Sequence, residues 1–260
     1  SWLIICSDEE SGARVDYYNW DEGVLRAKSS LRLSSSVAEL SQLTAGTLTG
    51  GEKALFVTSV TGDNLTVTDV LALRGGRLQN IASAADVNQA PAEQIFLGLF
   101  PRDENNDGVT EAPMTRALRR FDEESEPQYY VLWEQYSVDG TVSDVQSCFH
   151  NVSDGWSLVL PEEWNKAKLT AARSAGGDES IVSFYRANEN GSWEKLLTIY
   201  RLTGEAREGL ADIGDRFVLA QQVDAVYAAE IGSKWSVQLD EQSLRERFSL
   251  IMAEWTMGDN

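Results

Sequence analysis

The stretch Ala54–Leu73 has the sequence ALFVTSVTGDNLTVTDVLAL, which is two apolar runs joined by a short polar segment. Polar and apolar residues alternate over Leu65–Asp69 with the period of a β-strand, and the β-branched residues favour the same structure. The glycine, aspartate and asparagine of Thr61–Asn64 are typical of a tight turn. The stretch therefore predicts a β-hairpin, and the following Arg74–Gly76 predicts a second turn into a third strand from Arg77.

Two other parts of the chain show the same order of strand, turn, strand, glycine-ended turn and strand. One begins at Trp2 and the other at Tyr129. Their expected strands are Trp2–Ser7, Ala13–Trp20 and a strand from Val24, and then Tyr129–Tyr136, Asp144–Val152 and a strand from Trp156. This self-similarity indicates a degenerate repeat, whereas the alternative is three unrelated meanders that look alike because hairpins look alike.

The connector before the third copy contains DENNDGVTE (103–111), which has oxygen-bearing side chains at alternate positions around a glycine. Calcium binds about six to eight oxygens, and a short loop can supply most of them. Gly108 stands where such a loop turns sharply. The alternative is an acidic, solvated turn that binds no ion. The expected ligands are the side chains of Asp103, Asn105, Asp107 and Glu111 and the backbone carbonyl of Val109.

The loop departs from the EF-hand pattern at its twelfth position, where Met114 replaces the bidentate glutamate. A paired helical EF-hand is therefore not expected. Gln42–Glu52 precedes the second copy much as this loop precedes the third. We expect it to be a worn copy of the loop that has lost its carboxylates.

Strands with glycine-ended turns and a D-x-N-x-D-G-x-x-E loop entering the next unit resemble FG-GAP (integrin-type) repeats over roughly residues 1–150. The resemblance implies β-propeller blades with a calcium ion in the loop between blades. The signature dipeptides are absent, the connectors are long, and three units do not close a propeller. A partial propeller-like arrangement and a sheet stack both remain open. The chain is also similar to secreted lipoproteins of Gram-positive bacteria, which implies an extracytoplasmic location and a lipid anchor upstream.

The pattern changes at Asp154, which predicts two domains, 1–153 and 154–260. The second domain begins with a strand ended by Pro161 and a helical turn at Glu162 and Glu163. Its further strands are expected at Lys168–Arg173, Ser180–Arg186, Trp193–Leu202 and Arg216–Gln221, and Val223–Ile231 is either another strand or a helical turn.

An apolar stripe at helical spacing predicts a closing helix in the second domain, with Asp240 as its N-cap. The stripe consists of Leu244, Phe248, Ile251 and Trp255. The predicted fold is thus mostly β, with antiparallel meander repeats followed by an α+β layer. The second domain is similar to the Mog1/PsbP-like sandwich, a likeness that implies no activity.

The net charge of −19 makes nucleic acid an unfavourable partner, because such binding requires clustered lysine and arginine. No apolar run reaches the length of a membrane span. The only histidine, His150, excludes sites that need several histidines, and no nucleophile-elbow motif surrounds it. Cys6 and Cys148 form either a disulfide or two buried thiols, and we favour thiols.

We therefore expect a non-catalytic extracytoplasmic protein with a structural calcium ion and an unknown protein or glycan partner at the cell surface. The alternative is a secreted hydrolase or carbohydrate-binding protein that acts on polysaccharide. Most of the eight tryptophans lie in apolar segments and are expected in the core, with Trp20 and Trp164 the expected exposed sugar platforms. The acidic run Asp122–Glu126 is expected to be a solvated loop, with a weak second cation site as the alternative.

Overall fold

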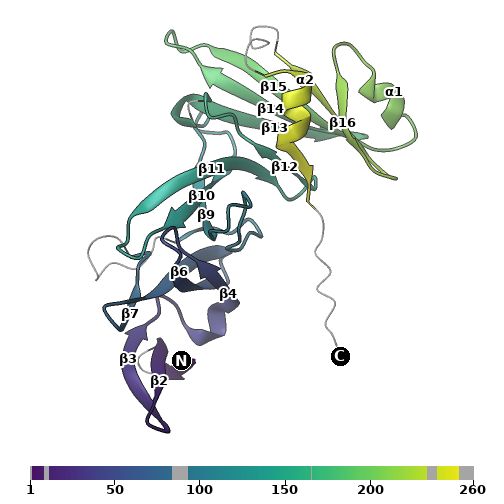
Figure 1. Ribbon diagram of the computed structural model, residues 1–260. Helices are drawn as coiled ribbons and strands as arrows, with labels where there is room; N and C mark the ends of the chain where they lie inside the picture. Colours follow the sequence, from purple (N-terminus) through teal and green to yellow (C-terminus); the bar gives the residue numbers. More distant parts are fainter. Residues whose placement is uncertain (1, 9–11, 84–92, 165, 233–238, 252–260) are drawn as a thin grey trace. The chain divides into compact units, whose positions relative to one another are not determined.

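The structure of the chain is a computed structural model that describes residues 2–8, 12–83, 93–164, 166–232 and 239–251. It is mostly β and is built from antiparallel sheets (Figure 1), so the predicted fold class is confirmed. The chain divides into two compact units, 1–115 with 132–146 and 116–131 with 147–260. The sequence predicts a single boundary after Ser153, whereas here the strands around residues 131 and 146 contribute to both units.

The first unit contains three groups of strands. The first sheet has the order β1-β2-β3, and the second has the order β4-β5-β6-β7, with β8 paired to β6. The third group follows the order β9-β10-β11. A 3-10 turn, Val37–Glu39, precedes β4. The strands are β1 (Trp2–Asp8), β2 (Gly12–Asp21), β3 (Val24–Arg32), β4 (Leu40–Thr47), β5 (Lys53–Val60), β6 (Leu65–Arg74), β7 (Arg77–Asn80), β8 (Gln94–Ile95), β9 (Glu111–Ala117), β10 (Tyr129–Tyr136) and β11 (Val142–Asn151).

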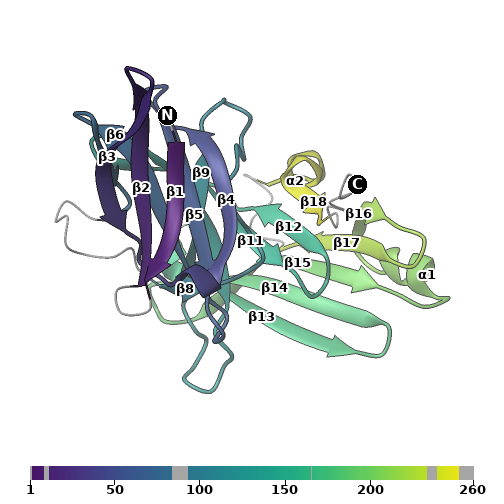
Figure 2. The ribbon, with the colours of Figure 1, turned by 90° about the horizontal axis from the view of Figure 1, so that it is seen from below.

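The central strands of the second sheet of the first unit, β5 and β6, are buried on both faces. One face, which includes Val57 and Leu71, packs against Val15 and its neighbours on the first sheet. In Figure 2, β1 of the first sheet is drawn beside β5, and β4 is drawn on the far side of β5. The other face, which includes Phe56, packs against Ala112 at the start of β9. Ala112 in this group of buried residues directly follows Glu111, the last residue of the predicted calcium loop.

All nine strands expected in the three copies are present, because alternation and turn residues are local signals. The connectors before the second and third copies also contain strands, which include β4 and β9. Gln42–Glu52 is not a worn metal loop. It forms most of β4 and a hairpin turn closed by a 2.8 Å hydrogen bond from the Leu48 N–H to the Glu52 carbonyl.

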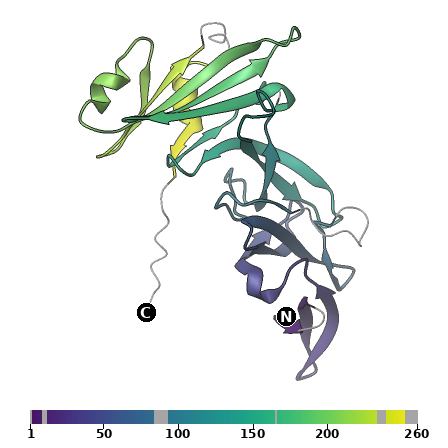
Figure 3. The ribbon, with the colours of Figure 1, turned by 180° about the vertical axis from the view of Figure 1, so that it is seen from behind.

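The second unit packs a five-stranded sheet of order β13-β14-β15-β17-β16 against β11, β12 and β18, which belong to a five-stranded sheet of order β18-β12-β11-β10-β9. The shared core contains Trp156, Trp164 and Phe184, and Leu244 of α2 joins it. Figure 3 shows α1 at one end of the larger sheet. The elements are β12 (Trp156–Val159), the 3-10 turn Lys166–Lys168, β13 (Leu169–Gly176), β14 (Glu179–Ala187), β15 (Trp193–Leu202), α1 (Arg207–Ala211), β16 (Phe217–Gln221), β17 (Val226–Ile231), α2 (Glu241–Arg247) and β18 (Phe248–Leu250).

The closing helix begins where the sequence predicts but ends earlier. The Asp240 side chain accepts a hydrogen bond from the Ser243 N–H and completes a capping box, so the predicted N-cap is confirmed. The prediction that Phe248 and Ile251 continue the helix is wrong. Phe248 is extended and starts β18, which pairs with β12. Trp255 lies outside the described residues.

The structure also decides two other predictions in the second unit, the helical turn after Pro161 and the segment Val223–Ile231. Glu162 and Glu163 lie in an isolated turn closed by a hydrogen bond from the Trp164 N–H to the Pro161 carbonyl, so the predicted helical turn is wrong. Val226–Ile231 is a strand, which decides between the two alternatives for that segment. Within the described ranges, no helix is long and apolar enough to cross a membrane.

Candidate metal centre

The ends of the predicted loop, 103–111, are fixed to neighbouring strands. Arg102 and Glu111 form a β-bridge with N···O distances of 3.0 and 2.8 Å, which closes the base of the loop. Thr110 attaches the loop to β4 because its N–H donates to the Thr47 carbonyl (2.9 Å) and its Oγ1 accepts from the Thr47 N–H (3.2 Å). Gly46 permits this approach, since an added Cβ would lie 2.7 Å from Thr110 Oγ1.

Side-chain oxygens of the loop organise its backbone. Asp103 accepts hydrogen bonds from the N–H groups of Asp107 (3.1 Å) and Gly108 (2.9 Å). Asn105 Oδ1 accepts from the Asp107 N–H, and Asp107 Oδ1 accepts from the Val109 N–H. Gly108 has a φ of 87°, the left-handed conformation that favours glycine, so the sharp turn expected there is present. The loop is therefore folded by the same side chains that are expected to bind the ion.

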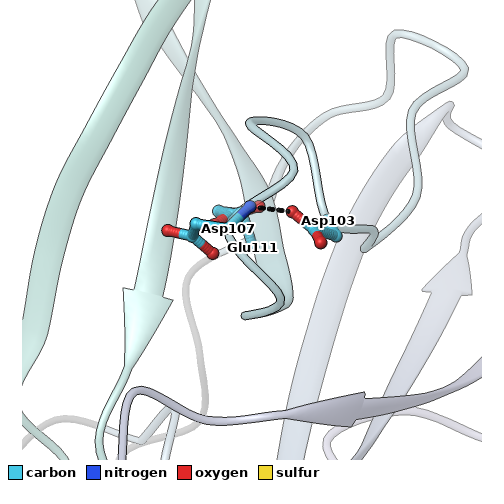
Figure 4. Close-up of side chains that lie close together, drawn as sticks. All are labelled: Asp103, Asp107 and Glu111. Atoms are coloured by element: carbon cyan, nitrogen blue, oxygen red, sulfur yellow. Dashed lines mark hydrogen bonds between the residues drawn. The ribbon is translucent and has the colours of Figure 1, made fainter.

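Three of the predicted ligands bring their carboxylates together. One carboxylate oxygen each from Asp103, Asp107 and Glu111 lies within 4.8 Å of the other two (Figure 4). Asp103 and Asp107 are exposed, whereas Glu111 is fully buried at the start of β9. An ion here would be reached from solvent through the loop and would be anchored on its far side by a residue of the core.

The other two predicted ligands, Asn105 and Val109, lie in the same loop. The Asn105 amide nitrogen donates to Asp107 Oδ2 (2.9 Å), while its oxygen faces the Asp107 N–H. The N–H of Val109 is bonded to Asp107. Both residues are thus tied to the central aspartate.

A residue that the sequence does not single out, Gln135, links two of the carboxylates. Gln135 lies on β10, and its Nε2 donates hydrogen bonds to Asp107 Oδ2 (2.7 Å) and Glu111 Oε1 (2.6 Å). The second Glu111 oxygen accepts from the Glu104 N–H (2.7 Å). No local motif identifies Gln135, because it reaches the loop only through the pairing of neighbouring strands.

The three carboxylates of the centre place several negative charges close together. Burial raises the pKa of Glu111 above its ordinary value, and the charges of Asp107 and Asp103 act in the same direction, against the hydrogen bonds from Gln135 and Glu104. Hydrogen bonds from the Asn105 side chain and the Val109 N–H lower the pKa of Asp107. A cation would favour the charged form of all three carboxylates.

The Asp122–Glu126 run differs from this centre. Asp122 Oδ1 accepts from the N–H and the hydroxyl of Ser125, so the aspartate caps its own turn. Among the described residues, only Asp103, Asp107 and Glu111 bring three metal-ligating side chains this close together. The run is an exposed loop, as the sequence predicts.

The other residues that the sequence analysis discusses do not belong to this centre. Trp20 is 63% exposed, as expected, but the expectation for Trp164 is wrong, because it is only 2% exposed and packs against Phe184. His150 is partly buried on β11. Cys148 is a buried thiol, and the side chain of Cys6 lies outside the described part of the chain.

No protein family, no curated protein and no solved structure matches this chain.

Proposed function

We propose that the first unit binds one calcium ion at Asp103, Asp107 and Glu111 and that the ion is structural. The observation that carries the proposal is the convergence of the three carboxylates, whose ligand atoms lie within 4.8 Å of one another. Calcium–oxygen distances are about 2.3–2.6 Å, so two oxygens on one calcium ion can lie up to about 5 Å apart. The spacing therefore suits calcium without rearrangement of the loop backbone.

Gln135 completes the proposed site. Its two hydrogen bonds use carboxylate oxygens that an ion would need, Asp107 Oδ2 and Glu111 Oε1. We infer that Nε2 hydrogen-bonds to the carboxylates when no ion is bound and that rotation of the amide presents Oε1 to the ion. An amide oxygen is an ordinary calcium ligand.

The ligand set implies modest affinity. Only three of the proposed ligands are charged, and the bidentate glutamate of the EF-hand is replaced by Met114. Calcium affinity depends on the charge and number of ligands, and extracellular modules bind at about 0.1–1 mM. This range supports, as part of the proposal, an extracytoplasmic protein at a bacterial cell surface, where calcium at that level would fill the site.

The ion would act on stability rather than on a reaction. It would neutralise charges that repel one another and hold the loop between β4 and β9, where Thr110 and Glu111 already anchor it. A ligand present at about 10 to 100 times its dissociation constant stabilises the folded state by about 1.4 to 2.7 kcal/mol. We therefore expect EDTA to lower the melting temperature by several degrees.

The test is a calcium titration followed by thermal unfolding of three proteins. Wild type should melt at a higher temperature with about 10 mM calcium, which is about 10 to 100 times the dissociation constant expected above, and Asp107→Ala should lose the response. Asp139→Ala is the matched control, because Asp139 is also an exposed aspartate before a left-handed glycine and caps its own turn by accepting from the Thr141 N–H. An equal calcium response in both variants, or none in wild type, would overturn the proposal.

A role in binding a protein or glycan at the cell surface, without catalysis, belongs to the same proposal. The second candidate is a carbohydrate-binding protein or hydrolase that acts on polysaccharide, and the observation that favours it is the exposed indole of Trp20. Contiguous exposed apolar patches often mark binding sites, and Trp20 on β2 pairs with Leu25 on β3, which is also exposed. Retention of wild type, but not of Trp20→Ala, on insoluble polysaccharide would support this candidate, and hydrolysis lost on changing a single carboxylate would establish the enzyme.

A further inference from the structure

We draw no further inference here: the strongest candidate, the polar pocket of about 450 Å³ that the start of β15 and the end of β17 line in the second unit, carries nothing, because Lys195 faces it together with Asp215 and Glu230 and nothing in the structure shows which ligand these charges of both signs would take.

Discussion

Gln135 donates a hydrogen bond of 2.6 Å from Nε2 to Oε1 of Glu111, a buried carboxylate 24 positions earlier in the chain. The same nitrogen reaches Asp107, so one uncharged amide occupies the place between two carboxylates where a cation would bind. These two hydrogen bonds bridge Asp107 and Glu111 and so favour the close approach of their carboxylates. The arrangement also predicts that a negative charge at position 135 should have opposite effects on the calcium-free and the calcium-bound protein.

Gln135→Glu should destabilise the calcium-free protein and strengthen calcium binding. The variant removes the donor from buried Glu111, a loss of about 1–3 kcal/mol for an unsatisfied buried group, and adds a fourth carboxylate. The added charge should increase the affinity for calcium, because affinity rises with ligand charge. Urea unfolding in EDTA and in excess calcium measures both effects.

Gln42→Glu is the control for this experiment. Gln42 is an exposed glutamine on β4 of the same unit, and its amide donates to Thr44 Oγ1. It should change neither the EDTA stability nor the calcium affinity appreciably. Equal behaviour of the two variants would contradict the role given to Gln135.

Gly46→Ala should destabilise the first unit and weaken calcium binding together. An alanine Cβ would lie 2.6 Å from Phe56 Cε2 and 2.7 Å from Thr110 Oγ1, and neither side chain has free space, because both are buried. Overpacking of this kind costs about 1–3 kcal/mol. Displacement of Thr110 would also move Glu111, the next residue, so calorimetry should show a lower calcium affinity.

Gly62→Ala is the matched glycine control, because no atom would lie within 4 Å of its added Cβ. It should alter stability by less than about 0.5 kcal/mol and leave calcium affinity unchanged. If Gly46→Ala loses stability but keeps full affinity, the loop does not depend on its attachment to β4.

Much of the first unit could be predicted because its signals are local. Ala54–Leu73 contains its own strands and turn, and Asp103–Glu111 contains its own turning glycine and all of the ligands expected from the sequence. Gln135 could not be predicted, because its position beside Glu111 depends on the packing and register of β9 and β10. The sequence contains no separate signal for that register.

The end of α2 shows how one pattern can support two structures. Leu244 and Phe248 are four positions apart, a spacing that favours a helix, yet Phe248 and Leu250 also alternate as a strand does. The pairing of β18 with β12 decides in favour of the strand. Tertiary pairing, rather than local preference, therefore ends the helix at Arg247.

Trp164 and Trp20 should respond differently to truncation, because only the first is buried. Trp164→Ala would leave a cavity beside Phe184 and should cost about 3–5 kcal/mol of unfolding free energy. Trp20→Ala should change stability by about 0.5 kcal/mol or less, as exposed positions usually do. Chemical denaturation of both variants measures the difference, and similar losses would contradict the burial described for Trp164.

Asp69 should make the stability of the first unit depend on pH in the acidic range. Its carboxylate is fully buried on β6 and accepts hydrogen bonds from the Ser34 N–H (3.0 Å), the Ser34 hydroxyl and the Asn80 amide (2.6 Å). Burial raises the pKa of Asp69 above its ordinary value of 3.8, and these hydrogen bonds oppose the rise. The folded state then holds the proton more tightly than the unfolded state does.

Stability contributed by Asp69 should therefore be highest below pH 3.8 and fall as the pH rises toward the folded-state pKa. Asp69→Asn cannot titrate, so the unfolding free energy of wild type minus that of the variant should decrease over this interval. Ser34→Ala removes a hydrogen bond that lowers the Asp69 pKa, so the decrease should extend to higher pH. Urea unfolding from pH 3 to 7 measures the unfolding free energy of all three proteins. This range extends roughly three pH units above the ordinary pKa of an aspartate. A difference that rises with pH would show that the hydrogen bonds outweigh burial and that the folded-state pKa lies below the unfolded one.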